Sequence, residues 1–508
     1  MNSKRGLRGH LVDLAIGLVL TAILLGMGEA SLRALGMADP GAQADLSRGF
    51  DATAAYIVPD PEVTGGWVTQ FAEGGLKEVT IPPRGPGQPG SAQRPTRVLL
   101  FGGSNTDKFP YGRLQQFLNE AGGHWEVINL GRSGYGSARV SILLEQALDR
   151  LAPDVVVLYT GHNEFVEQSF ERDLEQEWSG PVGQRIGRWA AGSHVVTGVR
   201  SLLASAAPAA AGKRPEAWKW EYDKFKGLTY PETLKVYERY GENLEQMCRT
   251  ALDRQVGVLL CTVVHNHYAA PFESTLPADW PPARVEEFNE LRDAIQTDFP
   301  AWLRPLAPLE ARDRVISGDW QVPADRRRQP PLPPMELGAR TCLGPLADAP
   351  AKRPNRKRWS EKAWSLLEAL EQLRVRDLGP EREHLERLVS RLEEALELCP
   401  EHPLSHFELG LMHLALGGDP ELIATHFEAA ARFDRAPRRG NGATNDILRD
   451  IAARSTDVVL LDAAQLFSER MPMGLVGWEW MSDHCHLNPG ACLVFMADLA
   501  QVLQQHWR

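Results

Sequence analysis

Cysteine and net positive charge are both scarce in this sequence, and each shortage excludes a class of protein. The 508 residues include six cysteines without paired metal-ligand spacing or a dense framework, which excludes a cysteine-rich zinc module and a disulfide scaffold. Cys261 and Cys399 lie in apolar contexts, so we expect them to be small core residues. If the chain is exported, one disulfide could form, and the sequence leaves its pairing open. The formal net charge of −11 argues against nucleic acid as the main partner.

Long hydrophobic runs are absent as well, apart from one at the amino terminus. Residues 11–28 read LVDLAIGLVLTAILLGMG, which is long enough to cross a bilayer as a helix. Basic residues precede this run, which predicts a cytoplasmic tail over 1–10, a single-pass transmembrane anchor over 11–30 and the remainder outside the cytoplasm. A cleaved signal peptide is the alternative, but the run is long for one and no clear A-x-A site follows it.

From residue 97 onward, after a loop-rich region over 31–96, short apolar runs alternate with amphipathic segments. The apolar runs predict buried parallel strands at 97–103, 125–131, 154–161, 256–264 and 457–462. Apolar residues at helical spacing predict helices at 110–120, 138–151, 230–255 and 489–505. The alternation predicts an α/β fold with a doubly wound, parallel five-stranded sheet, in which ligands bind beyond the carboxyl ends of the strands.

About two hundred residues separate the last two predicted strands, so a further segment is inserted into the sheet domain. The expected parts are a sheet domain over 97–275 and 441–508, a Pro- and Arg-rich linker over 276–358, and a helical insert over 359–440. The insert repeats with a period of about 34 residues, and tetratricopeptide positions are filled by Leu409, Gly410, Phe427 and Ala430. Only about one and a half repeats are visible, so a hairpin packed on the sheet and a peptide-binding array both stay open.

Four short segments far apart in the chain carry the polar residues of one candidate active site. They read GGSNT at 102–106, NLGRSG at 129–134, GHNE at 161–164 and DHCH at 483–486. The first three follow predicted strands, where a doubly wound sheet binds its ligands. Together the four supply a serine, a backbone amide, an amide side chain and an acid–base pair, which are the groups that acyl transfer through a serine ester requires.

The serine and the acid–base pair are the candidate catalytic groups. Glycines before Ser104 let the backbone turn sharply and leave the hydroxyl exposed, although a serine that caps the next helix would have the same pattern. The spacing of Asp483 and His486 brings a carboxylate beside an imidazole, so that the aspartate can hold the ring while the other ring nitrogen faces the serine. A surface Asp/His turn is the alternative, and His484 is a rival base that should point away.

Two further segments are candidates for an oxyanion hole. Gly134 could present its backbone amide, and Asn163 its side-chain amide, to a developing negative charge. Either residue could equally be an ordinary turn former. His162 and Glu164 are expected to hold the loop around Asn163 rather than to take part in chemistry.

The four segments together resemble the SGNH, or GDSL-type, hydrolase superfamily, over roughly 97–272 and 445–505. More narrowly, GGSNTDKFPYGRL, VINLG and YTGHNEF resemble a bacterial subgroup. In that subgroup a membrane anchor precedes the hydrolase domain, and tetratricopeptide-like helices precede the last segment. The resemblance thus implies an α/β/α hydrolase in the inner membrane, with its catalytic domain in the periplasm.

The resemblance also implies a role for each site residue. Ser104 would be the nucleophile, His486 the base and Asp483 its partner. The backbone amides of Ser104 and Gly134, with the side chain of Asn163, would form the oxyanion hole. No metal and no organic cofactor is implied.

This chain departs from the superfamily pattern at three positions. Gly103 and Glu164 stand where aspartate is usual, and Asn105 stands where many members have an apolar residue. None of these changes removes a catalytic group, but they put in doubt any substrate taken from better-known members. The role of His265 and His267, just past the fourth predicted strand, stays open between substrate contact and a structural part.

We therefore expect a membrane-anchored, periplasmic serine esterase. Its substrate would be an O-acetylated glycan or a lipid ester of the cell envelope, and no nucleic acid is expected as partner. One alternative is an O-acyltransferase that passes the acyl group to an envelope polysaccharide through the same residues. The other is a scaffold in which the tetratricopeptide-like helices bind a protein partner and the hydrolase site is vestigial.

Overall fold

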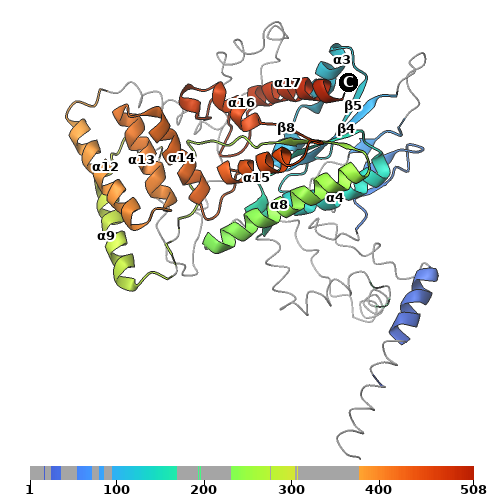
Figure 1. The fold of residues 1–508 in the computed structure, drawn as a ribbon, viewed down its shortest axis with the longest axis horizontal. Helices are drawn as coiled ribbons and strands as arrows, with labels where there is room; N and C mark the ends of the chain where they lie inside the picture. The colour runs from blue at the N-terminus through green and yellow to red at the C-terminus, as the bar shows by residue number, and fades with distance from the viewer. Residues whose placement is uncertain are drawn as a thin grey trace, which may run out of the picture. The chain divides into compact units, whose positions relative to one another are not determined.

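The computed structural model describes residues 24–35, 54–70, 79–84, 94–168, 230–274, 279–303 and 377–507, with a few single positions beside them (Figure 1). These residues fall into two compact units. The larger unit comprises the described residues of Ile81–Ser169 and Glu221–Arg508. The smaller unit comprises those of Met1–Thr80 and Phe170–Trp220, and in it β1 (Ile57–Pro59) pairs antiparallel with β2 (Trp67–Thr69).

Five parallel strands form the central sheet of the larger unit, in the order β5-β4-β6-β7-β8. They are β4 (Thr96–Gly102), β5 (Trp125–Asn129), β6 (Val155–Tyr159), β7 (Gly257–Cys261) and β8 (Val458–Leu461). The predicted five-stranded parallel sheet is therefore confirmed. The chain leaves β4 for β5 on one side and then crosses to β6 on the other. The carboxyl end of β4 is thus a topological switch point, where a crevice forms between diverging connections.

Helices cover both faces of the sheet (Figure 1). One face carries α3 (Tyr111–Glu120) and α17 (Pro489–His506), which pack against each other. The other face carries α4 (Ser137–Leu151), α8 (Tyr230–Asp253) and α15 (Gly442–Ala453). Apolar residues of α4 recur every three or four positions and are buried, as expected of a helix with one face on a sheet: Val140, Leu143, Leu144, Ala147, Leu148 and Leu151.

The strands are mainly apolar because helices cover both of their faces, and the buried Arg97 of β4 pairs with Glu126 of β5. Every residue of β6 is buried, and so is every residue of β4 after Thr96. Beside the carboxyl ends of these strands, Phe109, Tyr159 and Phe495 pack with ring centroids 5.0 to 5.3 Å apart. This aromatic cluster makes the switch point rigid, because packed aromatic side chains have little room to move.

A second core lies in the helical insert. It is formed by α12 (Glu381–Leu398), α13 (Pro403–Leu416) and α14 (Pro420–Phe433), together with α9 (Pro282–Asp298). The segment of α9 was expected to be linker, but its Phe288 and Ile295 are buried in this core. The side-chain carboxylate of Asp419 accepts a hydrogen bond from the Glu421 amide at 3.0 Å and so caps α14, while Gly417 ends α13 at a φ of 71°. The helical character predicted for the insert is confirmed over 381–433. Residues 359–376 lie outside the described chain, and the tetratricopeptide resemblance stays a prediction.

Two other predictions concern residues that the structure describes in part. The predicted anchor over 11–30 lies largely outside the described residues, and among those described no helix has the length and apolar character needed to span a membrane. The described cysteines are buried and free, namely Cys248, Cys261, Cys399, Cys485 and Cys492. Cys261 and Cys399 are therefore core residues, as predicted. Cys342, the sixth, lies outside the described chain.

Truncation of Phe427 to alanine should destabilise the larger unit by about 3–5 kcal/mol, because it leaves a cavity where a fully buried ring packs against Phe407 and Tyr268. Leu422→Ala on the same helix is the matched control, since Leu422 is 40% exposed and should cost under about 0.5 kcal/mol. Denaturant midpoints followed by circular dichroism measure both. Equal midpoints for the two variants would show that the insert has no packed core.

Candidate active site

Ser104 lies at the switch point of the sheet. It is the first residue of α2 (Ser104–Lys108), directly after β4, and two glycines make the connection. Gly102 has a φ of 155°, and a Cβ atom there would lie 2.2 Å from the Tyr159 carbonyl oxygen on the neighbouring strand. Only glycine fits such a position without moving the backbone. The sharp turn that the sequence predicted before Ser104 is therefore present.

Ser104, His486 and Asp483 form one continuous chain of hydrogen bonds. The Ser104 Oγ lies 2.7 Å from His486 Nε2, and His486 Nδ1 lies 2.7 Å from Asp483 Oδ2. Because an ionised carboxylate can only accept, Nδ1 carries a proton and donates a hydrogen bond to Asp483, which leaves Nε2 to accept one from the serine hydroxyl. The structure thus brings together the serine and the acid–base pair singled out from the sequence, across 382 positions of chain.

Asp483 also organises the turn that carries His486. Its Oδ1 accepts hydrogen bonds from the backbone amides of Cys485 at 2.9 Å and His486 at 2.8 Å. Burial by itself would raise the pKa of Asp483, but the hydrogen bond and charge of His486 and the charge of His484 hold that pKa well below its usual range. Asp483 is therefore ionised at neutral pH and able to stabilise a protonated His486.

His484, the rival base, does not reach the serine. Its ring packs edge-on against Phe272 with centroids 4.8 Å apart, and its Nδ1 lies 3.9 Å from Asp483 Oδ1. No hydrogen bond joins it to Ser104. The expectation that His484 points away is therefore consistent with its contacts.

Asn105 fastens the turn around His486 to the helix that carries Ser104. Its side-chain Nδ2 donates to the Cys485 carbonyl at 2.7 Å, and its Oδ1 accepts from the Leu487 amide at 3.1 Å. Asn105 is 4% exposed, so these bonds are shielded from water. Sequence reasoning treated Asn105 only as a departure from the usual pattern. The signal that could have identified it is its place directly after the serine, where a side chain must face the residues that hold the base.

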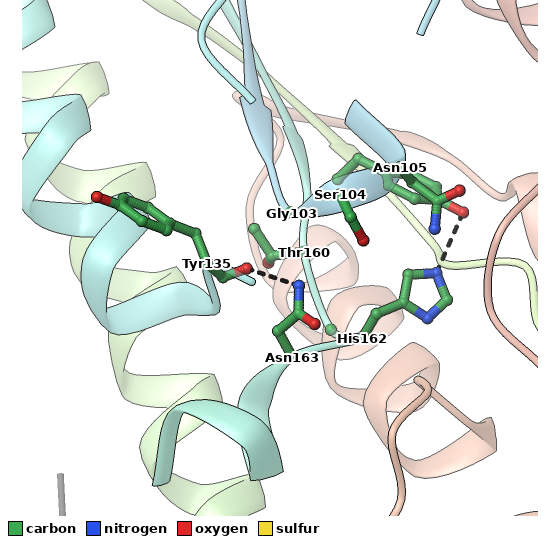
Figure 2. A pocket seen from close by; sticks show the side chains of 9 residues that line it. Gly103, Ser104, Asn105, Tyr135, Thr160, His162 and Asn163 are labelled. Carbon is green, nitrogen blue, oxygen red and sulfur yellow. Dashed lines mark hydrogen bonds between the residues drawn. The ribbon is translucent and has the colours of Figure 1, made fainter. Parts of the chain in front are cut away.

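Asn163 follows β6 and faces the same space as Ser104. Its Nδ2 donates to the Tyr135 carbonyl at 3.0 Å, which fixes the orientation of the amide (Figure 2). The second N–H of that nitrogen has no hydrogen-bond partner among the described residues and remains free to donate. A Cβ atom on Gly103 would lie 2.2 Å from Nδ2. A side chain at position 103 would therefore displace this amide.

Gly134 lies in the loop between β5 and α4, next to Tyr135, with a φ of 81°. The guanidinium of Arg139 donates to the Gly134 carbonyl and pairs with Glu167, whose Oε1 lies 2.7 Å from Arg139 Nε. Glu167 in turn accepts from the amide of Gly136, the N-cap of α4, at 3.0 Å and from that of Ala138 at 2.8 Å. Arg139 and Glu167 therefore hold the Gly134 loop, a role that sequence reasoning missed because both lie just outside the four segments.

Glu164 supports the same loop from the other side. It accepts from the Ser137 hydroxyl at 2.6 Å and from the Ser137 amide at 3.1 Å, and it is buried. Burial and the nearby charge of Glu167 raise the pKa of Glu164 well above its ordinary value of 4.5. Glu164 thus holds the loop, as predicted from the sequence, rather than facing the serine.

His162 is a buried structural residue beside the site. Burial, with smaller contributions from His486 and His484, lowers its pKa to about 3, so the ring is neutral at neutral pH. Its Nδ1 accepts a hydrogen bond from the Gly440 amide at 2.9 Å. This bond ties the loop after β6 to the chain that leaves the helical insert.

A small pocket opens over Ser104 (Figure 2). Its walls come from the ends of β4 and β6 and from the loop after β5: Gly103, Ser104, Asn105, Tyr135, Tyr159, Thr160, Gly161, His162 and Asn163. A hydroxyl with an adjacent base and an amide donor across a small space can attack an ester carbonyl and stabilise the resulting oxyanion. Among the described residues, Asp483, Cys485 and His486 also lie close enough to ligate a metal, but Asp483 and His486 are already joined to each other and to Ser104.

Comparisons with known proteins give partial structural similarity. No protein-family model matches the chain, and no curated protein matches it. A GDSL-like lipase from Bacteroides thetaiotaomicron aligns at 14% identity and a TM-score of 0.18, over 34% of this chain and 51% of that one. TesA aligns at 15% identity and a TM-score of 0.19, over 43% of this chain and 86% of that one. This chain thus spans about half the length of the first structure, and scores this low identify no family.

Replacement of Glu164 by glutamine should change how stability depends on pH. Since the folded-state pKa of Glu164 is raised, its contribution to stability is complete below its unfolded pKa of 4.5 and is lost as pH rises through the folded value. The variant has no such loss, so its stability relative to the wild type should increase between about pH 5 and about pH 8. Denaturant titrations at both pH values measure this. Glu145→Gln, on the exposed face of α4, should show no such increase, and equal pH profiles for all three proteins would refute the assignment.

Proposed function

We propose that this protein is a serine esterase of the SGNH, or GDSL, type, with Ser104 as nucleophile, His486 as base and Asp483 as the residue that orients and charges the base. The single observation that supports this best is the unbroken path Ser104 Oγ to His486 Nε2 to Asp483 Oδ2, with both steps at 2.7 Å. A helix-capping serine and a surface Asp/His turn have no reason to meet, because Ser104 lies 382 positions before His486.

The proposed reaction follows from the direction of these hydrogen bonds. The Ser104 oxygen attacks the ester carbonyl carbon while its proton passes to His486 Nε2. The resulting imidazolium is stabilised by ionised Asp483. Collapse of the tetrahedral intermediate expels the alcohol, which takes the proton from His486, and leaves an acyl-enzyme. Water then gives a proton to His486 as it attacks the acyl carbonyl. When this second intermediate collapses, His486 returns the proton to Ser104 Oγ and the carboxylic acid is released.

The negative charge that develops on the carbonyl oxygen of the intermediate needs hydrogen-bond donors. We assign this role to the free N–H of the Asn163 side chain, together with the backbone amides of Ser104 and Gly134. Tyr135 holds the Asn163 amide, and Arg139 with Glu167 holds the Gly134 loop, so the donors would be in place before substrate binds. Such preorganisation is usually the largest single contribution to catalysis of acyl transfer.

Hydrolysis of short p-nitrophenyl esters by the full-length chain in detergent tests the proposal. Ser104→Ala and His486→Ala should each lower kcat at least about 10³-fold, because each removes a group that acts in the transition state. Ser133→Ala is the matched serine control, since its hydroxyl donates to Asp107 at 2.8 Å and Ser133 does not line the pocket over Ser104. His484→Ala is the matched histidine control. Full activity of Ser104→Ala, or loss of activity in His484→Ala with retention in His486→Ala, would contradict the assignment.

The proposed oxyanion hole makes a separate prediction. Asn163→Ala should lower kcat by about 10²–10³-fold with little change in KM, because the donor acts mainly in the transition state. Gly103→Ala should lower kcat in the same direction, since its Cβ would lie 2.2 Å from the Asn163 amide nitrogen. Steady-state kinetics of both variants measure the effect. If Gly103→Ala had wild-type kinetics, the close approach of Gly103 and Asn163 would not be needed for activity.

We further propose that the esterase faces the periplasm from an anchor over 11–30, and that it acts on an O-acetylated glycan or lipid ester of the envelope. The apolar run and the basic residues before it support this placement. Protease treatment of spheroplasts, with detection of the carboxyl-terminal helix, separates the two orientations. Degradation in intact spheroplasts supports the proposal, and protection until lysis would overturn it.

A further inference from the structure

Three side chains outside the Ser104 site meet at the border between the sheet and the helical insert. They are His265 and His267, in the segment after β7, and Glu428 on α14. His267 Nε2 lies 2.7 Å from Glu428 Oε1, and His265 Nε2 lies 4.0 Å from the same oxygen. The two imidazole rings lie side by side with centroids 4.4 Å apart. One potential ligand atom from each residue thus lies within 4.8 Å of the others.

His267 faces a hydrogen-bond acceptor at each of its ring nitrogens. Its Nδ1 lies 3.0 Å from the Val476 carbonyl oxygen, and its Nε2 faces the Glu428 carboxylate. Neither oxygen can donate when Glu428 is ionised, so a neutral imidazole can satisfy only one of the two contacts. A cation between Nε2 and the carboxylate removes this conflict. The remaining Nδ1–H to carbonyl bond is the outer contact that orients histidines in metal sites.

His265 supplies an independent observation. It is 4% exposed, and its Nε2 has no hydrogen-bond partner among the described residues. A buried polar atom without a partner costs free energy and needs an explanation. Because this nitrogen is directed toward Glu428 and lies beside the His267 ring, a shared ligand between the three groups would satisfy it.

We propose that His265, His267 and Glu428 bind a divalent transition-metal cation, and specifically Zn²⁺. Two imidazole nitrogens and one carboxylate oxygen are a donor set that zinc accepts in tetrahedral sites. Ligand atoms around such an ion lie about 3.3 Å apart, between the 2.7 and 4.0 Å separations seen here, so small side-chain shifts suffice. The Glu428 side chain is 43% exposed, which leaves an entry path and a position for water as fourth ligand.

The charges around the cluster permit a cation. Arg439 is buried nearby and is the main competing positive charge, but the buried carboxylate of Asp434 offsets it. Arg439 also has a structural use here, because its guanidinium donates to the Asn266 carbonyl at 2.6 Å. The Glu428 carboxylate is therefore left to neutralise part of the charge of the ion.

The proposed ion would couple the helical insert to the active-site turn. Asn266, between the two histidines, donates its backbone amide to the His484 carbonyl and its side-chain amide to the Asp483 carbonyl, both at 3.2 Å. Zinc held by Glu428 would thus join α14 to the segment that braces Asp483 and His484. The ion is expected to stabilise the turn that carries Asp483 and His486. It takes no part in the esterase chemistry.

Zinc titration of the full-length, tag-free chain tests the proposal. After dialysis against a chelator, the wild type should bind one equivalent of Zn²⁺, and Co²⁺ in its place should give ligand-field absorption typical of tetrahedral coordination. Zinc should also raise the melting temperature, because a ligand that binds only the folded state stabilises it. Glu428→Gln and His265→Ala should each weaken binding at least about tenfold and remove the thermal shift.

Two controls make the result specific. His384→Ala removes a partly exposed histidine on α12 whose Nε2 hydrogen-bonds the Asp298 carbonyl at 2.8 Å, and it should bind zinc like the wild type. His486→Ala tests the Asp483, Cys485 and His486 group, and it too should retain binding. The proposal is overturned if folded wild type binds neither ion, if Glu428→Gln binds as tightly as wild type, or if binding is lost with His486 instead. Because Glu428 is partly exposed, its glutamine variant should fold, which circular dichroism checks.

Discussion

The two hydrogen bonds of the Asn105 side chain are the constraint on which the candidate site depends. Ser104 belongs to a short helix after the first central strand, whereas His486 belongs to a turn that follows the last one, with the helical insert between them. Asn105 bonds to the backbone on both sides of His486, at Cys485 and Leu487. Because its amide has one donor group and one acceptor oxygen in fixed geometry, it sets both the distance and the angle at which the imidazole meets the serine.

The sheet lowers the conformational entropy lost when Ser104 and His486 are brought together. The insert divides β7 from β8 in sequence, yet the two strands pair directly in parallel register. In this sheet the carboxyl ends of β4, β6 and β7 lie at the same edge. The residues that follow these strands therefore lie close to the site. The insert is held to the same framework by polar contacts, including the His162 bond to Gly440 and the pairing of His267 with Glu428. A long insertion therefore costs the site little, since it joins elements that the sheet already fixes.

The fold was predictable because the signals were local. The central strands are short and mainly apolar, and the helices between them show clear helical spacing. The parallel sheet and the placement of Ser104 and Asn163 at strand ends therefore followed directly. The residues that position the site were not predictable in this way. Asn105, Arg139 and Glu167 act through contacts with backbone groups whose neighbours are set only by tertiary structure. The same limit applies to His265 and Glu428, which are far apart in sequence and meet only after the insert packs.

The central claim is that Ser104 is activated by a base that Asn105 holds in place. The most direct measurement is covalent labelling of the full-length chain with a fluorophosphonate, read at single-residue resolution by peptide mass spectrometry. We expect labelling of Ser104 in the wild type, none in His486→Ala, and markedly slower labelling in Asn105→Ala, in which serine and histidine are both retained. Labelling of another serine, no labelling of folded wild type, or equal rates in wild type and Asn105→Ala would contradict the account.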